Sequence, residues 1–190
     1  MKGISAGYGL FSGVRHFFAM AGKQDEPHLN EKVGYWGERL VLDAELLGLG
    51  TCWVGGTFHK EVCEEKIGLT PEEKLVCIIL VGSVPKQKTI KESMVRLAVR
   101  HARKPLDELY TAEELDESFL DGMRAVRKAP SAFNRQPVHF LYRNHTVFPQ
   151  VPDPGSFQGI DLGIAMLHFE IGSHADSRFG QIEGHYMLRI

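Results

Sequence analysis

Apolar side chains recur every three or four positions in several parts of the chain, which is the period of an amphipathic helix. The clearest case is residues 31–47, whose apolar stripe consists of Val33, Trp36, Leu40, Ala44 and Leu47. Gly48 follows at the point where helices often end in a left-handed residue. Residues 60–67, closed by Gly68, have the same period, and so do residues 160–172, which also end in a glycine. The pattern therefore predicts three helices that each end at a glycine.

Three Thr-x-x-Glu sequences predict further helix starts, because in such a capping box each side chain binds a backbone N–H of the other residue. They begin at Thr70, Thr89 and Thr111. The second predicts a helix or a mobile basic segment over residues 89–103. The third predicts a helix over residues 111–128, whose buried stripe consists of Leu115, Phe119, Met123 and Val126.

Other stretches have the patterns of strands. Residues 75–82 are apolar on both faces and rich in β-branched side chains, which is typical of a strand buried within a sheet. Residues 138–143 alternate in strand fashion and continue into residues 145–148, and residues 185–190 predict a closing strand. Helices and strands alternate too irregularly for a βαβ array. We therefore expect an α+β fold, with a central mixed sheet flanked by helices, in a single domain over residues 1–190.

The net charge, the length of the apolar runs and the cysteine spacing argue against several classes of protein. The 22 Lys and Arg residues and the 24 Asp and Glu residues give a net charge of −2, which argues against a dedicated nucleic-acid binder. The longest apolar run, residues 75–81, is far shorter than the roughly 20 residues of a membrane span. No apolar stretch follows Lys2 as it would in a signal peptide. Three cysteines without Cys-x-x-Cys spacing argue against a disulfide framework or a zinc site. We expect a cytoplasmic protein without a bound metal.

Two short segments carry most of the candidate chemistry. The glycine motif, residues 48–56 (GLGTCWVGG), has four glycines that leave backbone N–H groups open to a ligand. The polar loop, residues 129–137 (APSAFNRQP), lies between two prolines and suits hydrogen bonding to a heteroaromatic ring or a polyol. Taken alone, the glycine motif could also be a tight connection between helices. The polar loop alone could be a solvated loop whose Ser and Asn cap their own turns.

Together, the two segments resemble the paired signatures of FMN-dependent nitroreductases. The strand pattern LVCIILVG and the basic segment HARKPLDEL, residues 101–109, are also similar to that family. The order of the segments, with the glycine motif first, resembles a branch of bacterial nitroreductases whose chain ends with a helix like residues 161–172. The first thirty residues contain only Arg15. The arginine-bearing N-terminal helix that contacts the flavin phosphate in the family is therefore missing from the pattern.

The resemblance assigns cofactor-binding residues one by one. Ser131, Asn134 and Gln136 match positions that line the flavin and its ribityl chain. The turn Val54-Gly55-Gly56 matches the place where backbone N–H groups face N5 and O4 of the isoalloxazine. The resemblance implies no catalytic side chain, because the chemistry is carried by flavin N5.

The phosphate end of the flavin is assigned to a basic position. Arg103 matches the late basic position of the family, with His101 and Lys104 as neighbours, and a guanidinium can bind phosphate oxygens through two hydrogen bonds. The implied activity is the transfer of electrons from NADH or NADPH through FMN to a nitroaromatic, a quinone or a similar acceptor. The resemblance also implies a homodimer, in which a second copy covers apolar surface over residues 3–20.

Two other functions stay open. A flavin- or nucleotide-binding protein without turnover is favoured by the missing N-terminal arginines. Residues 86–104 carry a local charge of +6 and could form a nucleic-acid patch, but no aromatic side chain for base stacking is interleaved with them. Nine histidines invite a metal hypothesis, yet His59 and Cys63 form only half a site.

Overall fold

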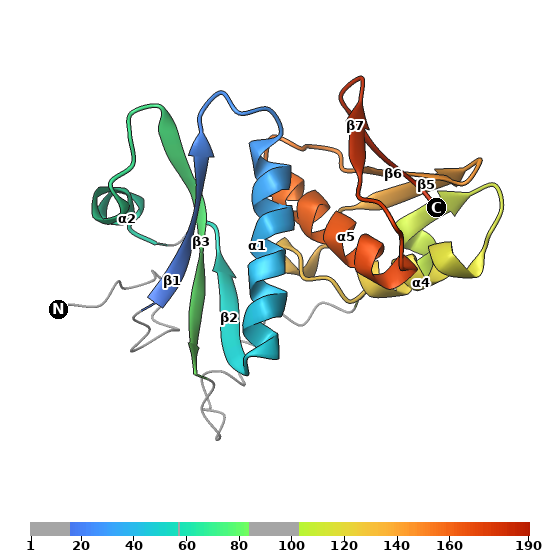
Figure 1. The fold of residues 1–190 in the computed structure, drawn as a ribbon, viewed down its shortest axis with the longest axis horizontal. Helices are drawn as coiled ribbons and strands as arrows, with labels where there is room; N and C mark the ends of the chain where they lie inside the picture. The colour runs from blue at the N-terminus through green and yellow to red at the C-terminus, as the bar shows by residue number, and fades with distance from the viewer. Residues whose placement is uncertain (1–15, 57, 84–102) are drawn as a thin grey trace. The chain divides into compact units, whose positions relative to one another are not determined.

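The computed structural model describes residues 16–56, 58–83 and 103–190, which form two compact units. The first unit contains residues 16–29, 37–56 and 58–83, and the second contains residues 30–36 and 103–190. Helix α1 (Leu29–Leu46) contributes to both. The expected α+β class is confirmed, with the strands divided between two sheets (Figure 1). The expectation of one domain over residues 1–190 stays a prediction. Among the described residues, no helix is both long enough and apolar enough to cross a membrane.

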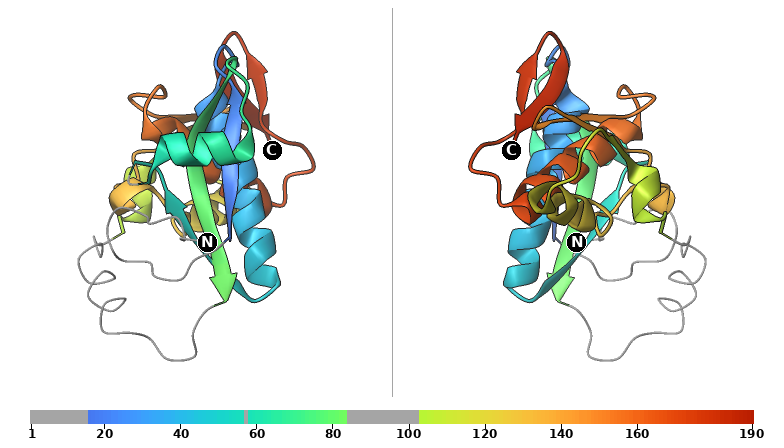
Figure 2. Two further views of the ribbon diagram at one scale, coloured as in Figure 1. Left: turned by 90° about the vertical axis from the view of Figure 1, so that its left-hand side faces the viewer. Right: turned by 90° about the vertical axis from the view of Figure 1, so that its right-hand side faces the viewer.

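The first unit is an antiparallel sheet with one helix across it. The strands β1 (His16–Lys23), β3 (Glu73–Ser83) and β2 (Leu49–Val54) lie in the order β1-β3-β2. Strand β3 is central, as its apolar run predicted, because both of its edges are paired. Helix α2 (Lys60–Ile67) crosses in front of the sheet in the left-hand view of Figure 2 and buries Cys63 against it.

The second unit is a five-stranded sheet that packs with two helices. The strand order is β4 (Tyr110–Ala112), β5 (His139–Arg143), β6 (Thr146–Gln150), β8 (His185–Arg189) and β7 (Gly180–Ile182). Only β4 and β5 are parallel, so the sheet is mixed. The helices are α4 (Glu117–Val126) and α5 (Phe157–Ser173), and two 3-10 turns are η1 (Leu106–Leu109) and η2 (Ala132–Asn134).

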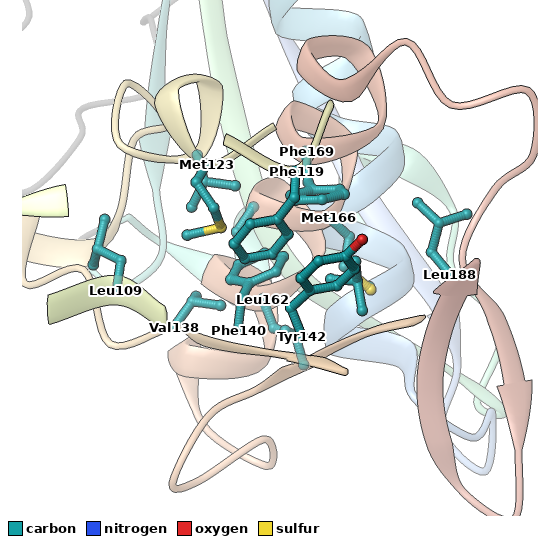
Figure 3. Close-up of a cluster of buried hydrophobic side chains, with 13 residues drawn as sticks. Leu109, Phe119, Met123, Val138, Phe140, Tyr142, Leu162, Met166, Phe169 and Leu188 are labelled. Carbon is teal, nitrogen blue, oxygen red and sulfur yellow. The ribbon is translucent and has the colours of Figure 1, made fainter. Parts of the chain in front are cut away.

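An aromatic cluster fills the space between the helices and the sheet of the second unit (Figure 3). The rings of Phe119 and Tyr142 stack with centroids 4.4 Å apart, and Phe140 stacks on Phe169 at 5.3 Å. Phe119 comes from α4 and Phe169 from α5, so the cluster joins both helices to β5. Burial of large aromatic rings supplies much of the hydrophobic stabilisation of such a unit.

The helix ends at glycine are confirmed in two of three cases. Gly48 and Gly68 have φ of 73° and 65° directly after α1 and α2, as the pattern predicted. Gly172 is different, since α5 continues through it and ends before His174, which itself has φ 53°. A Cβ at Gly172 would collide with Ala125 of α4. This glycine therefore permits close helix packing and does not end the helix.

The two described Thr-x-x-Glu sequences do not start helices. The Glu73 carboxylate accepts from the Thr70 nitrogen at 3.1 Å, as in a capping box, but the Glu73 nitrogen donates to the Thr70 carbonyl and Glu73 pairs with Lys23 in the sheet. Thr111 lies in β4, and α4 starts later with Asp116 as its cap, which accepts from the Phe119 nitrogen at 2.7 Å. Sheet pairing overrides the local helix signal in both places. The third sequence, at residues 89–92, lies outside the described residues.

Three smaller expectations are also corrected. The glycine motif is strand β2 over most of its length, because its Thr, Trp and Val side chains favour extended backbone beside β3. Residues 146–150 form a separate strand after a two-residue turn, where Asn144 and His145 have positive φ. Leu115 precedes α4 and is exposed, whereas Phe119, Met123 and Val126 are buried as predicted.

Gly163 of α5 is in backbone contact with α1, and this contact can be tested. A Cβ at this position would collide with the carbonyl oxygen of Glu31, which cannot move away as a flexible side chain would. We expect Gly163→Ala to lower the free energy of unfolding by about 1–3 kcal/mol in urea denaturation followed by circular dichroism. Gly180→Ala is the matched control, because its Cβ would meet open space. It should change the free energy by less than about 0.5 kcal/mol. Equal changes in the two variants would contradict the assigned contact.

Candidate functional site

The polar loop of the second unit has an unusual backbone. It connects α4 to β5, and Phe133, Asn134 and Gln136 have φ of 54°, 54° and 47°. Left-handed backbone is tolerated by Asn, but for Phe and Gln it costs on the order of 1–3 kcal/mol each. The Phe133 side chain is also 61% exposed, with the Arg135 guanidinium 5.2 Å from its ring centroid. Strained backbone and an exposed aromatic ring in one short loop are typical of a functional segment.

Hydrogen bonds within the loop maintain this conformation. The Asn134 nitrogen donates to the Ser131 carbonyl at 2.9 Å, and the Arg135 nitrogen donates to the Ala132 carbonyl at 3.1 Å. The Gln136 nitrogen donates to the Ser131 hydroxyl at 2.9 Å. Ser131 therefore accepts two bonds from the loop itself, while its hydroxyl proton can still be donated elsewhere.

The side chain of Gln136 is buried, at 6% exposure. Its Oε1 accepts from the Lys104 nitrogen at 2.8 Å, and its Nε2 donates to the Arg127 carbonyl at 3.2 Å. Both ends of the amide are thus bonded to backbone. Of the three loop residues assigned from the resemblance, Ser131 and Asn134 are half-buried, whereas Gln136 joins the loop to two other segments.

These two segments carry four cations, here called the basic cluster: Arg103, Lys104, Arg127 and Lys128. Arg103 donates from Nη1 to the Arg127 carbonyl, and Arg127 donates from Nε to the Lys104 carbonyl at 3.0 Å. In the described ranges, no ion pair joins any of the four to a carboxylate. Four cations on two segments that are joined by these bonds favour the binding of an anion. His101, the other predicted neighbour of Arg103, lies outside the described residues.

A buried carboxylate lies behind the polar loop. Asp161 of α5 is 4% exposed, and its Oδ1 accepts from the Ala132 nitrogen at 2.8 Å. Burial raises the pKa of Asp161 to about 6, and the bond from Ala132 opposes that rise. Asp161, Ser131 and Gln136 border a cavity of about 20 Å³. This cavity has room for about one water molecule and none for a larger ligand.

The glycine motif, in the first unit, is anchored in a similar way. The Trp53 indole donates to the Glu38 carboxylate at 3.2 Å, and Glu38 is only 2% exposed. Trp53 also lies directly over Gly37, where a Cβ would collide with the ring. Val54 is buried in the unit, while the following Gly55 and Gly56 are half-buried and exposed. Only the backbone of the Val54-Gly55-Gly56 turn is therefore available to a ligand.

The remaining candidates are less suited to chemistry. Burial raises the pKa of the Cys52 thiol, so this cysteine is not an activated nucleophile. Within the described ranges, no group of three His, Cys, Asp or Glu residues could hold a metal ion. An open hollow of about 660 Å³ in the first unit lies beside α2 and is lined by side chains of both charges, with none of the predicted site residues among them.

The sequence patterns missed three residues that organise these segments, namely Glu38, Asp161 and Arg127. A usable signal existed for Asp161, because it is a single charge inside the apolar run of a helix. Glu38 had no comparable signal, because it lies beside Arg39 on a helix with several charged residues. Arg127 could be recognised only through its contacts with residues 103–104.

Comparisons with known proteins give a family and a similar fold. The family model described as "Putative TM nitroreductase" matches residues 1–173. A solved structure, a "putative nitroreductase" from Thermotoga maritima, is similar with a TM-score of 0.61 and 22% sequence identity. The similarity covers 88% of this chain and 67% of that chain. At this identity, the structural match bears on the fold alone. A comparison with curated proteins found no match.

The anchoring role of Gln136 can be tested without any ligand. Gln136→Ala would leave the partly buried Lys104 nitrogen without its acceptor and would remove one of the two side-chain donors to the Arg127 carbonyl. We expect the free energy of unfolding to fall by about 1–3 kcal/mol in urea denaturation. Arg135→Ala, at an exposed neighbour, is the control and should change it by less than about 0.5 kcal/mol. A Gln136→Ala protein as stable as the parent would show that this side chain does not hold the loop.

Proposed function

Because the chain belongs to the nitroreductase family described as "Putative TM nitroreductase", whose members are oxidoreductases, we propose that it is an FMN-dependent oxidoreductase. It would pass electrons from NADH or NADPH to a nitroaromatic, a quinone or a similar acceptor. The proposal combines family membership with the two segments that resemble flavin-binding signatures. We keep the cytoplasmic location as part of the same proposal.

The basic cluster is the observation that carries the choice of FMN. A phosphate monoester bears between one and two negative charges near neutral pH, and Arg binds its oxygens through charge-assisted hydrogen bonds. Arg103 and Lys128 are exposed, and Arg103 is held by the Arg127 carbonyl. Its guanidinium is therefore partly ordered before any ligand binds, which lowers the entropy cost of binding. Under this proposal, the basic cluster would bind the phosphate in place of the family's N-terminal arginines.

The other parts of FMN have suitable partners in the two segments. Ser131 and Asn134 offer a hydroxyl and an amide for the ribityl hydroxyls or the ring edge. Gly55 and Gly56 offer backbone N–H groups without a Cβ in the way, so that the flavin ring could lie close to the chain. Gln136 contributes indirectly under this proposal, because it holds Ser131 and the basic cluster in one arrangement.

Bound FMN would supply the hydride and electron transfer itself. In the second unit, the basic cluster would bind the phosphate and the polar loop would hold the polar edge. In the first unit, of this chain or of a second copy, the Gly55-Gly56 backbone would offer N–H groups to the ring. Donors near the N1–O2 edge of a flavin stabilise negative charge there and raise the reduction potential. No side chain of this chain is required to move a proton to N5.

The alternative is a flavin-binding protein without turnover, built on the same residues. The two proposals differ in one measurement, the steady oxidation of NADH or NADPH in the presence of a quinone or nitroaromatic. Purified protein that shows flavin absorption near about 370 and 450 nm, bands set by the cofactor itself, and that lacks this turnover would favour the binding protein.

Arg103→Ala tests the phosphate contact directly. We expect the affinity for FMN to fall about tenfold or more, because a charge-assisted hydrogen bond contributes about 1.5–3 kcal/mol. The affinity for riboflavin, which has no phosphate, should change less than about twofold. Arg189→Ala removes an exposed arginine of β8 outside the basic cluster and serves as the charge-matched control.

Two results of these titrations would contradict the proposal. Equal loss of FMN and riboflavin affinity in Arg103→Ala would show that Arg103 does not contact the phosphate. If the parent protein binds neither flavin, the FMN-dependent activity itself is wrong.

We also propose that the protein is a homodimer, as the resemblance implies. Of the apolar surface expected over residues 3–20, residues 3–15 lie outside the described residues, and Met20 is already buried in β1. The exposed side chains of Leu46 and Leu47 at the end of α1 are further apolar surface that a second copy could cover. Light scattering at micromolar concentration should give twice the mass of one chain, and a monomer that retains flavin would contradict this.

A further inference from the structure

Asp161 is a buried charge with one defined task in the structure. It lies in the apolar first part of α5 at 4% exposure, and its Oδ1 accepts the Ala132 amide at 2.8 Å. Removing a carboxylate from water is unfavourable, and a single backbone bond offsets only part of that cost. A neutral side chain would fill the site with less loss of hydration energy. The presence of an acid here therefore indicates that its charge is used.

The bond from Asp161 is made where the strained backbone begins. Ala132 is followed directly by Phe133 and Asn134, both left-handed. Such a conformation persists only where its surroundings fix it. The bonds inside the loop close its turns, but the bond to Asp161 attaches the loop to a helix of the core. Beside it lies the cavity of about 20 Å³ that Asp161, Ser131 and Gln136 border.

We propose that Asp161 is the positioning residue of the polar loop, which it holds through the Ala132 amide, and that protonation of its carboxylate loosens the loop and weakens flavin binding. The part that concerns flavin rests on the function proposed above. The part that concerns the loop does not, because it can be observed in the protein without a ligand.

The titration of Asp161 falls in a useful range. Burial raises its pKa to about 6, so the carboxylate is ionised at neutral pH and takes up a proton in mildly acidic solution. An ionised acceptor makes a hydrogen bond roughly twice as strong as a neutral one. The elements around Asp161 carry several ionisable side chains, none of which forms an ion pair with it in the described part of the chain: Glu31, Asp107, Glu108, Arg127, Lys128, Arg135 and His139.

The free energy of unfolding should change in the opposite direction to the order of the loop. Protonation of Asp161 should loosen the loop but raise the contribution of this group to global stability. The pKa of Asp161 is higher in the native state than the value of about 3.9 in an unfolded chain. The native state therefore binds a proton between about pH 6 and 4 that the unfolded chain does not, and the contribution of this group to the free energy of unfolding rises as the pH falls. A loop that loosens in this window without a loss of global stability is released locally and not by acid unfolding.

The first measurement is hydrogen exchange of the Ala132 amide by NMR between about pH 5 and 8, without flavin. In the parent protein, the protection of the Ala132 amide against exchange should be about threefold to tenfold lower at about pH 5 than at about pH 8, after correction for intrinsic exchange. Asp161→Asn keeps an oxygen acceptor but cannot titrate, so protection should be nearly independent of pH. Asp161→Ala removes the acceptor, so protection should be low throughout.

The second measurement is flavin affinity over the same range, with riboflavin as the probe. FMN is unsuitable here, because its phosphate titrates near pH 6. Riboflavin affinity of the parent should fall about threefold to tenfold toward low pH, while Asp161→Asn should show no such step. The Asn variant also controls for the other ionisable side chains of the protein, because these are the same in both proteins.

Either of two exchange results would overturn the proposal: parent-like protection of Ala132 in Asp161→Ala, or a parent-like pH profile in Asp161→Asn. If Asp161→Ala does not fold, the Asn variant alone decides. The expected exchange behaviour in a protein that binds no riboflavin would confirm the anchor and contradict the flavin function.

Discussion

Close contact between the backbone of α5 and its neighbours is the constraint on which the second unit depends. Gly163 faces the backbone of residues 31–35 of α1, and Gly172 faces α4, at separations that exclude any Cβ. Because the helices meet so closely, the aromatic side chains of α4, α5 and β5 are brought into stacking contact in one cluster. The position of α5 in turn determines where Asp161 meets the polar loop. Packing and site geometry are therefore consequences of the same small residues.

A buried carboxylate on a long helix anchors the candidate segment in each unit. Glu38 of α1 accepts from Trp53 in the glycine motif, and Asp161 of α5 accepts from Ala132 in the polar loop. The two bonds differ in kind, since one is made to a side chain at the end of a strand and the other to the backbone of a strained loop. In both, a helix supports a segment that has exposed backbone or exposed side chains. A site needs such support, because loosely held groups lose binding energy when they are ordered.

The polar residues of the loop divide into those that support it and those that it presents. Gln136 is used entirely within the protein, and Ser131 partly so, whereas Phe133 and Arg135 are directed to solvent. The same amide of Gln136 links the loop to the basic cluster. A ligand with an anionic end and a polar middle part would therefore meet two groups of residues whose relative positions are already determined. This is the physical basis for the proposal that the chain binds a phosphorylated cofactor.

The sequence by itself determined the elements whose signals are local: α1 and α2 with their glycine ends, the apolar strand β3, the buried stripe of α4 and the closing strand β8. It also indicated the nitroreductase family, because the two motifs that carry the resemblance are short continuous segments that can be recognised without the structure. The tertiary structure alone decided that Thr70 and Thr111 do not start helices, since Glu73 pairs with Lys23 and Thr111 with Leu141 in the two sheets. It alone decided that Gly172 permits helix contact and that Arg127 joins Arg103. These outcomes depend on partners far away in the chain, and a pattern of neighbouring residues carries no information about which partners will meet.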